Sequence, residues 1–332
     1  MITTTNLEDC FMGSVRLSKK LMKRFCKDYN LPINVFTDEM FEYYSELYDF
    51  FPKEKWDKLC EKVENEYGGN VELWLDYCAK VRDAAIYGVI ETEAYKRFNS
   101  EDMSKWALDA NVPRVGEHSV FTKENVGKIF ISIDLKKANF QALRWAEVID
   151  DDSYEDFVAR FGGDDYIAGS KYLRQVIFGK MNPSRTVTVE KYMMGIVYSV
   201  VHDYIEGMGY RFYSMNSDEL VFINEGIGGS NTYEDDMVAI VERVYEYGID
   251  VRCECFILGR LPIVNSNGND IDAYIRYNIH TKEETLKKVS TTFYPQVYKI
   301  WKGQPIDEKD KVFFFEDQLA YFVEPLKLDY GN

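Results

Sequence analysis

The stretch FYSMNSDELVFI, from Phe212 to Ile223, contains a strand-like segment, a polar turn and a second apolar segment. Aromatic and β-branched residues on both sides of a short polar turn favour a β-hairpin. The turn ends in Asp218 and Glu219, two adjacent carboxylates at the start of what reads as a buried strand. Burying like charges is unfavourable, so these side chains need a compensating charge from elsewhere in the chain.

A second strand that ends in a carboxylate precedes this hairpin. The segment GKIFISID (127–134) is rich in isoleucine and ends on Asp134. If the two strands lie side by side, Asp134 and Asp218 emerge at the same edge of the sheet. Mg²⁺ binds a few carboxylates together with substrate phosphates and water, and a two-metal site supports in-line displacement at phosphorus. We therefore expect the two aspartates to share Mg²⁺ or Mn²⁺.

The segments around these strands predict an α+β fold. Residues 188–209, TVEKYMMGIVYSVVHDYIEGMG, predict a long helix that ends at glycine. Residues 248–264, GIDVRCECFILGRLPIV, predict a strand or a strand pair, and residues 282–289 predict a helix near the end of the sequence. A strand, helices, a hairpin and a further strand together imply an antiparallel sheet with helices on one face.

The first third of the sequence predicts helices. Residues 37–51 place apolar side chains at helical spacing behind Thr37, an expected N-cap. Pro52 opens the next helix, and a pair of glycines ends it. The helical pattern continues over 70–90 and 100–112.

Length and composition indicate a well-packed protein. The 332 residues are 46% hydrophobic, and this length is enough for two or three domains. We expect a helical accessory domain over 1–120 and an α+β domain over 121–332. The six scattered cysteines, the lack of a secretory pattern and the lack of a long apolar run predict a cytoplasmic protein with no membrane partner.

The formal net charge of −16 argues against a protein that coats duplex nucleic acid, because phosphate neutralisation supplies most of that affinity. A nucleic-acid partner would have to be bound through a local basic patch, a small nucleotide or a divalent cation. The stretch 171–191 is basic, and within it Lys171 and Arg174 share a helix face, while Arg185 precedes an expected helix N-terminus. We expect these three residues to bind phosphates; the alternative is a solvated helix face.

Both aspartate stretches resemble motifs of palm-domain polymerases. IFISIDLKKANFQAL (129–143) resembles motif A of reverse transcriptases. GYRFYSMNSDELVFI (209–223) resembles their motif C hairpin, and resembles the Ser-Asp-Glu hairpin of the tRNA-His guanylyltransferase family more closely still. The resemblance implies a palm-like (ferredoxin-like) sheet and metal-dependent nucleotidyl transfer, in which a 3′-hydroxyl attacks a nucleoside triphosphate. The residues of these motifs are also similar to those of proteins of large tailed phages.

The resemblance implies a role for individual residues. Asp134 and Asp218 would be catalytic metal ligands for Mg²⁺ or Mn²⁺, with the Leu135 carbonyl as a further ligand and Glu219 as a ligand or supporting charge. The implied partners are a nucleoside triphosphate and an RNA or DNA end. The chain departs from these families at two places: Leu135 replaces the glycine of the guanylyltransferases, and Asn139 stands where reverse transcriptases have an aromatic residue.

Two alternatives remain open at this point. The stretch VARFGGDDYIA (158–168) resembles the Gly-Gly-Asp-Glu-Phe hairpin of diguanylate cyclases and its Gly-Gly-Asp-Asp relative, which would make Asp164 and Asp165 a cyclase site. That hairpin needs strands on both sides, whereas the apolar spacing over 154–161 predicts a helix. The other alternative is a non-catalytic, palm-like accessory or regulatory protein that binds a protein partner through its acidic surface.

Overall fold

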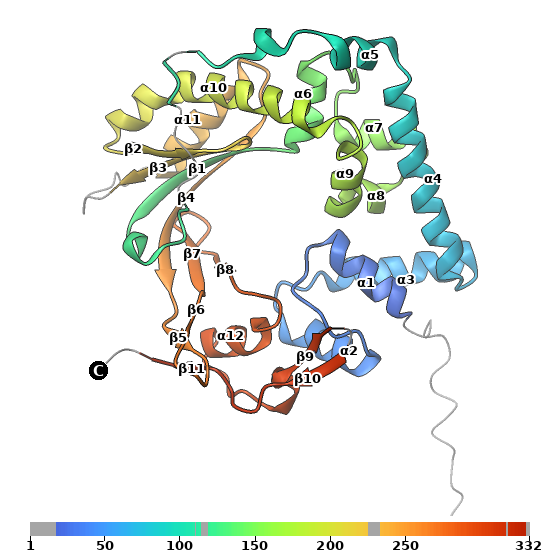
Figure 1. The fold of residues 1–332 in the computed structure, drawn as a ribbon, viewed down its shortest axis with the longest axis vertical. Helices are drawn as coiled ribbons and strands as arrows, with labels where there is room; N and C mark the ends of the chain where they lie inside the picture. Colours follow the sequence, from blue (N-terminus) through green and yellow to red (C-terminus); the bar gives the residue numbers. More distant parts are fainter. Residues whose placement is uncertain (1–17, 110, 114–118, 225–232, 317, 330–332) are drawn as a thin grey trace, which may run out of the picture.

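The computed structural model describes residues 18–109, 111–113, 119–224, 233–316 and 318–329. These residues form a mixed α/β fold in which the sheets are mostly antiparallel (Figure 1). This agrees with the expected combination of helices and an antiparallel sheet. None of the described helices is both long enough and apolar enough to cross a membrane.

A six-stranded sheet forms the centre of the fold, with the strand order β2-β3-β1-β4-β7-β8. Every neighbouring pair in it is antiparallel. The strands are β1 (Ile129–Leu135), β2 (Arg211–Met215), β3 (Glu219–Asn224), β4 (Val251–Arg260), β7 (Tyr274–Asn278) and β8 (Glu284–Lys287). The hairpin predicted from the opening stretch is β2–β3, and its second strand pairs with β1, as expected.

Helices cover one face of this sheet. They are α6 (Ala138–Trp145), α10 (Pro183–Gly207) and α11 (Tyr233–Tyr245), which lie together above the strands in Figure 1. Ile131 and Ile133 of β1 are fully buried in the large apolar core that these helices share with the sheet. These three helices therefore lie on the same face of the sheet.

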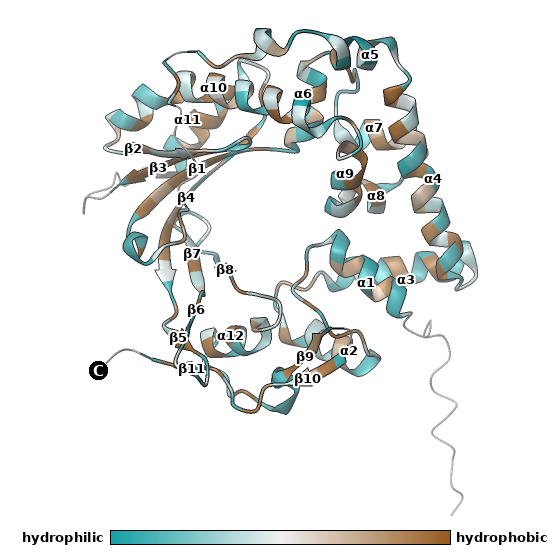
Figure 2. Cartoon of the chain, viewed as in Figure 1, coloured by the Kyte–Doolittle hydropathy of each residue, from teal (hydrophilic) through white to brown (hydrophobic). Residues whose placement is uncertain are grey.

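Residues that alternate with these along β1, namely Phe130, Ser132 and Asp134, point to the opposite face, which we call the non-helical face. Phe130 belongs there to a smaller apolar cluster with Val221 and Phe256. Figure 2 shows the strands as partly brown, in keeping with a sheet that is buried on both sides over much of its length. The non-helical face becomes charged toward the end of β1 that carries Asp134.

In the described part of the chain, five α-helices precede the sheet. The Thr37 hydroxyl accepts a hydrogen bond from the Met40 amide at 3.2 Å, which confirms this residue as an N-cap. Gly68 ends its helix with φ 60°, a left-handed conformation that glycine adopts without steric cost. The five helices are α1 (Lys19–Asp28), α2 (Asp38–Leu47), α3 (Lys53–Tyr67), α4 (Val71–Ile90) and α5 (Glu93–Ser100).

The helical prediction over 100–112 is wrong for most of that range. Among the described residues of that range, Ser100 ends α5 and only the short 3₁₀ helix η2 (Met103–Trp106) follows it. The following residues cross α10 at Gly195, where an added Cβ would lie 2.7 Å from the Leu108 side chain and 3.6 Å from Val112. Packing of this segment against α10 therefore replaces the helix that local spacing indicated.

The helix expected over 282–289 is also wrong, because these residues include strand β8. The sequence KEETLKKV consists largely of good helix formers, so local propensity favoured a helix. In the fold, Glu284 pairs with Tyr277 and Leu286 pairs with Ile275, and the Leu286 side chain is buried. Pairing with β7 and burial of this leucine override the propensity.

Three short helices follow α6, namely α7 (Tyr154–Arg160), α8 (Asp165–Gly169) and α9 (Lys171–Phe178). Helix α9 contacts both α1 and α4, so these helices pack against the N-terminal helices. The buried Asp28 of α1 is part of this contact, because it accepts hydrogen bonds from the Tyr166 and Ser170 hydroxyls.

The C-terminal segments return to the N-terminal helices. Lys302 forms an ion pair with Asp49 at 2.7 Å, and the Tyr43 hydroxyl donates to the buried Asp310. The division into 1–120 and 121–332 stays a prediction. The remaining elements are β5 (Ile263–Val264), β6 (Asp270–Ile271), α12 (Tyr294–Trp301), β9 (Val312–Phe315), β10 (Gln318–Tyr321), β11 (Lys327–Leu328) and the 3₁₀ helices η3 (Lys123–Asn125) and η4 (Glu308–Lys311).

Candidate functional site

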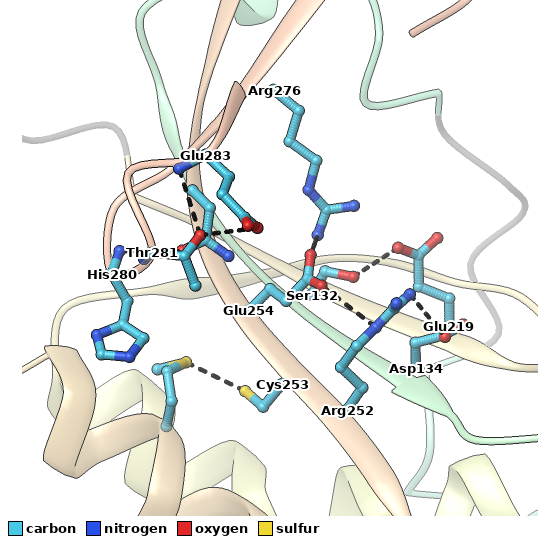
Figure 3. A network of polar contacts seen from close by, with 12 residues as sticks. Ser132, Asp134, Glu219, Arg252, Cys253, Glu254, Arg276, His280, Thr281 and Glu283 are labelled. Atoms are coloured by element: carbon cyan, nitrogen blue, oxygen red, sulfur yellow. Dashed lines mark hydrogen bonds and ion pairs between the residues drawn. The ribbon is translucent and has the colours of Figure 1, made fainter. Parts of the chain in front are cut away.

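Asp134 lies near the end of β1, directly opposite Glu219 of β3 on one side and Arg252 of β4 on the other. Cross-strand partners project from the same face of a sheet, so these side chains form a charged row on the non-helical face. The Arg252 guanidinium donates a hydrogen bond to the Asp134 carboxylate at 3.1 Å (Figure 3). Pairing of the hairpin with β1 thus brings together two of the three predicted catalytic carboxylates.

The β2–β3 turn brings the third, Asp218, next to the end of β1. The Asn216 side-chain oxygen accepts hydrogen bonds from the amides of Asp218 and Glu219, at 2.9 and 2.6 Å, which closes the turn. The Asp218 carbonyl accepts a hydrogen bond from the Leu135 amide at 2.8 Å. The backbone of the turn is therefore fixed against the residue that follows Asp134.

A polar network extends from this row across the non-helical face, as Figure 3 shows. The Ser132 hydroxyl donates to the Glu219 carboxylate at 2.6 Å. Arg252 also forms an ion pair with Glu254 at 3.2 Å, and Arg276 of β7 contacts the other oxygen of Glu254 at 2.5 Å. Carboxylates and guanidiniums therefore alternate from Asp134 on β1 to Arg276 on β7.

The surroundings of Asp134 disfavour its negative charge. Burial raises the pKa of the Asp134 carboxyl to about 6, although the Arg252 charge opposes this rise. The charges of Asp218, Glu219 and Glu254 raise the pKa of Asp134 further. We call these four acidic residues the carboxylate cluster; it holds more negative charge than Arg252 alone compensates.

Glu190 of α10 is a fifth carboxylate whose charge is coupled to this cluster. Its side chain is buried and accepts a hydrogen bond from the Asn139 amide of α6. Burial raises the pKa of Glu190 to about 7, the Asn139 hydrogen bond lowers it and the Asp218 charge raises it. The sequence signal for Glu190 is an acid at the start of the apolar run of the long helix.

The donor chemistry at this end of the sheet fits a hard divalent cation that arrives with a phosphate ligand. Asp134 and Asp218 supply carboxylates, and the crowding of acids around Asp134 favours a positive charge there. Mg²⁺ is commonly bound by one or two carboxylates plus substrate phosphates and water. Among the residues that the structure describes, no three His, Cys, Asp or Glu side chains are grouped so that they could hold a metal ion by themselves.

Two of the three predicted phosphate-binding residues contact other parts of the protein. The Arg185 guanidinium donates to the Glu101 carbonyl and lies over the Phe98 ring, 5.5 Å from its centre. The Arg174 guanidinium lies over the Tyr154 ring, 5.6 Å from its centre. These contacts place the two guanidiniums against aromatic side chains of the helical region.

Lys171, at the start of α9, has a different position. Burial lowers the pKa of Lys287 on β8, the Arg276 charge lowers it further, and Lys171 is close enough to contribute in the same direction. Lys171 therefore approaches a group of cations on β7 and β8 that sequence analysis missed. These cations belong to no recognisable sequence motif. Because residues 282–289 were predicted to form a helix, the sequence did not indicate that these cations share one face of a sheet.

The stretch containing Asp164 and Asp165 is a helix–loop–helix, as the apolar spacing before it predicted. Helix α7 ends at Arg160, and the Asp164 side chain caps α8 by accepting a hydrogen bond from the Ile167 amide at 2.9 Å. Asp164 also forms an ion pair with Lys62 at 2.8 Å. Helices rather than strands flank these two aspartates, so this stretch lacks the hairpin that the cyclase resemblance requires.

No protein-family model matches the chain, and no curated protein matches it. The most specific feature of the chain is the carboxylate cluster, which is assembled from β1, the β2–β3 hairpin and β4 and is bordered by cations on the non-helical face.

Proposed function

We propose that this protein is a palm-type, metal-dependent nucleotidyltransferase. The observation that carries the proposal is the convergence of Asp134 with the turn that contains Asp218 and Glu219. The connections of the sheet are consistent with it: β1, helices, the β2–β3 hairpin, α11 and β4 follow one another in the chain, and the strand order is β2-β3-β1-β4. This order corresponds to a ferredoxin-like βαββαβ unit, the sheet that a palm-like domain requires.

In this proposal, Asp134, Asp218 and the Leu135 carbonyl hold Mg²⁺ or Mn²⁺. When bound, the ion supplies charge stabilisation at a phosphoryl group and favours deprotonation of the attacking 3′-hydroxyl. Glu219, held by the Ser132 hydroxyl, supports the site with its charge. Arg252 pairs with Asp134 in the structure and is more than half exposed, so it is free to turn toward a bound phosphate.

The proposed substrates are a nucleoside triphosphate and an RNA or DNA end. Lys171, Arg174 and Arg185 remain the cations expected from the sequence to bind phosphates. The Lys171 charge reaches Lys287 of β8, which is consistent with this role for Lys171.

A second candidate is a non-catalytic accessory protein, and two specific observations favour it. Asp134 already has a cationic partner in Arg252, and the described residues contain no complete set of three metal-binding side chains. In that case the row of alternating charges would hold β3, β1 and β4 together, and the protein would act through contacts with another protein. Nucleotide binding distinguishes the two candidates.

We expect Mg²⁺ or Mn²⁺ together with a nucleoside triphosphate to raise the melting temperature. A ligand that binds only the folded state stabilises it, by about 2.7 kcal/mol at a concentration of about 100 times Kd. Metal alone should stabilise less, because the phosphates complete its coordination. Differential scanning fluorimetry with metal, nucleotide and both together measures this response.

The matched variant is the double substitution Asp134→Asn and Asp218→Asn. It should lose the response to metal and nucleotide. Without ligand it should be at least as stable as the wild type, because burial and neighbouring carboxylates raise the pKa of Asp134 and so disfavour its charge. A double variant that keeps the full response would contradict the proposed site.

A further inference from the structure

A cavity of ≈ 420 Å³ lies on the non-helical face beside the carboxylate cluster. Its lining includes Glu219 and Asn216 from the β2–β3 hairpin. Arg276, Lys287 and Lys288 line it from β7 and the end of β8. Among its described lining residues, three side chains are therefore cationic and one is acidic, within a chain whose formal net charge is −16.

The orientation of Arg276 is fixed by its neighbours. Its side chain is 14% exposed, its guanidinium carbon lies 3.9 Å from the centre of the Phe256 ring, and one nitrogen contacts Glu254 at 2.5 Å. Its buried Nε has no hydrogen-bond partner. Arg276 is thus a positioned guanidinium with a donor still unused.

The two lysines have no carboxylate partner among the described residues. Lys287 is half-buried and pairs in register with Tyr274, on the same face of the sheet as Arg276. Burial lowers the pKa of Lys287 and the Arg276 charge lowers it further, whereas the Glu254 charge acts in the opposite direction. The Lys288 ammonium lies 5.8 Å from the centre of the Phe121 ring.

We propose that this cavity binds a phosphate group, supplied either by the polyphosphate of a nucleotide or by the backbone of a nucleic-acid strand. A guanidinium and two ammoniums around one space match the charge and the several acceptor oxygens of a phosphate. Asn216 and Ser214 add polar groups at the hairpin side. Because Glu219 lines the cavity and lies opposite Asp134, the phosphate binds next to the carboxylate cluster.

The identity of the ligand as a nucleotide or a strand rests on the proposed function, whereas phosphate binding itself does not. The test therefore uses metal-free buffer containing a chelator. Two probes separate the sources: tripolyphosphate, followed by isothermal titration calorimetry, and a short single-stranded oligonucleotide with a fluorophore, followed by anisotropy. Both are measured at several salt concentrations, since a phosphate contact makes the affinity fall as salt rises.

The variant is Lys287→Gln with Lys288→Gln, which removes two positive charges from the cavity. We expect it to weaken binding of at least one probe about a hundredfold, about tenfold for each charge-assisted contact. The control is Lys53→Gln with Lys282→Gln, which removes two exposed lysines outside the cavity lining. It should change the affinity less than about threefold.

If the cavity variant loses only tripolyphosphate binding, the ligand of the cavity is the polyphosphate of a nucleotide. If it loses oligonucleotide binding, the ligand is a nucleic-acid strand. The inference is overturned if the wild type binds neither probe, or if the cavity variant binds as the control does. Asp218→Asn separates this result from the proposed function. It should bind the probe normally without metal while losing nucleotide turnover; if it retains turnover, the proposed function fails and the phosphate site stands.

Discussion

Asp218→Asn should abolish nucleotide turnover while leaving the fold intact. The substitution keeps the size of the side chain, and the turn is held by backbone groups and by Asn216, so the hairpin should form normally. Loss of a carboxylate from a metal centre that transfers phosphoryl groups should cost about three or more decades in rate. Incorporation of a labelled nucleoside triphosphate with Mg²⁺ or Mn²⁺ measures the effect.

Asp164→Asn and Asp165→Asn are the controls for this prediction, because they test the competing acidic motif. Asp164 caps α8, and asparagine caps helices about as well as aspartate, so the helix should persist. Its partly exposed ion pair with Lys62 should contribute no more than about 1 kcal/mol. Both variants should therefore keep turnover within about threefold of the wild type.

The opposite pattern would place the working site in the FGGDDY stretch and reduce the β2–β3 turn to a structural feature. A wild-type protein that turns over no nucleotide under any of these conditions would favour the accessory candidate. In that outcome, the main role of the charged row would be structural, with the ion pair between Arg252 and Asp134 joining β4 to β1.

Three of the four acids of the carboxylate cluster were predictable because their sequence signals are local. Residues 127–134 and the hairpin around Asp218 each combine β-branched or aromatic residues with an acid at the end of the strand. Their pairing followed from the order of strands and helices along the chain. The sequence could therefore predict β1, β2 and β3 together with their three acidic residues.

The cations of the site were not predictable in the same way. Arg252 joins the cluster because β4 places it opposite Asp134, and Arg276 joins it through Glu254. Such neighbours depend on the register between strands far apart in the sequence, which no local pattern specifies. The basic stretch that local charge did indicate gave Arg185, whose contacts are with Phe98 and Glu101.

Glu190 is the buried carboxylate of α10 whose pKa the Asp218 charge helps to raise. We expect Glu190→Gln to stabilise the protein by about 3 kcal/mol at pH 8 and to have little effect near pH 4.5. Burial raises the pKa of Glu190 from 4.5 to about 7 in the folded state. Between these values the unfolded chain releases its proton while the folded protein keeps it, so wild-type stability falls as pH rises.

Glutamine should remove this dependence because it resembles the protonated carboxyl. Its side-chain oxygen can still accept the hydrogen bond from Asn139 that Glu190 accepts in the structure. Above pH 7 the wild type carries a buried charge that the variant lacks, so the stability difference should grow through the window from 4.5 to 7 and then level off. Urea unfolding at closely spaced pH values measures it directly.

Subtracting the wild-type curve from that of the variant isolates Glu190 from other groups that titrate in the same window. Asp134 is one of them, since burial raises its pKa to about 6, but it contributes equally to both proteins. Glu242→Gln, at an exposed position on α11, is the matched control and should follow the wild-type curve. If Glu190→Gln also follows that curve, Glu190 ionises without penalty in the folded protein. The Asn139–Glu190 pair would then be open to water rather than buried beside the carboxylate cluster.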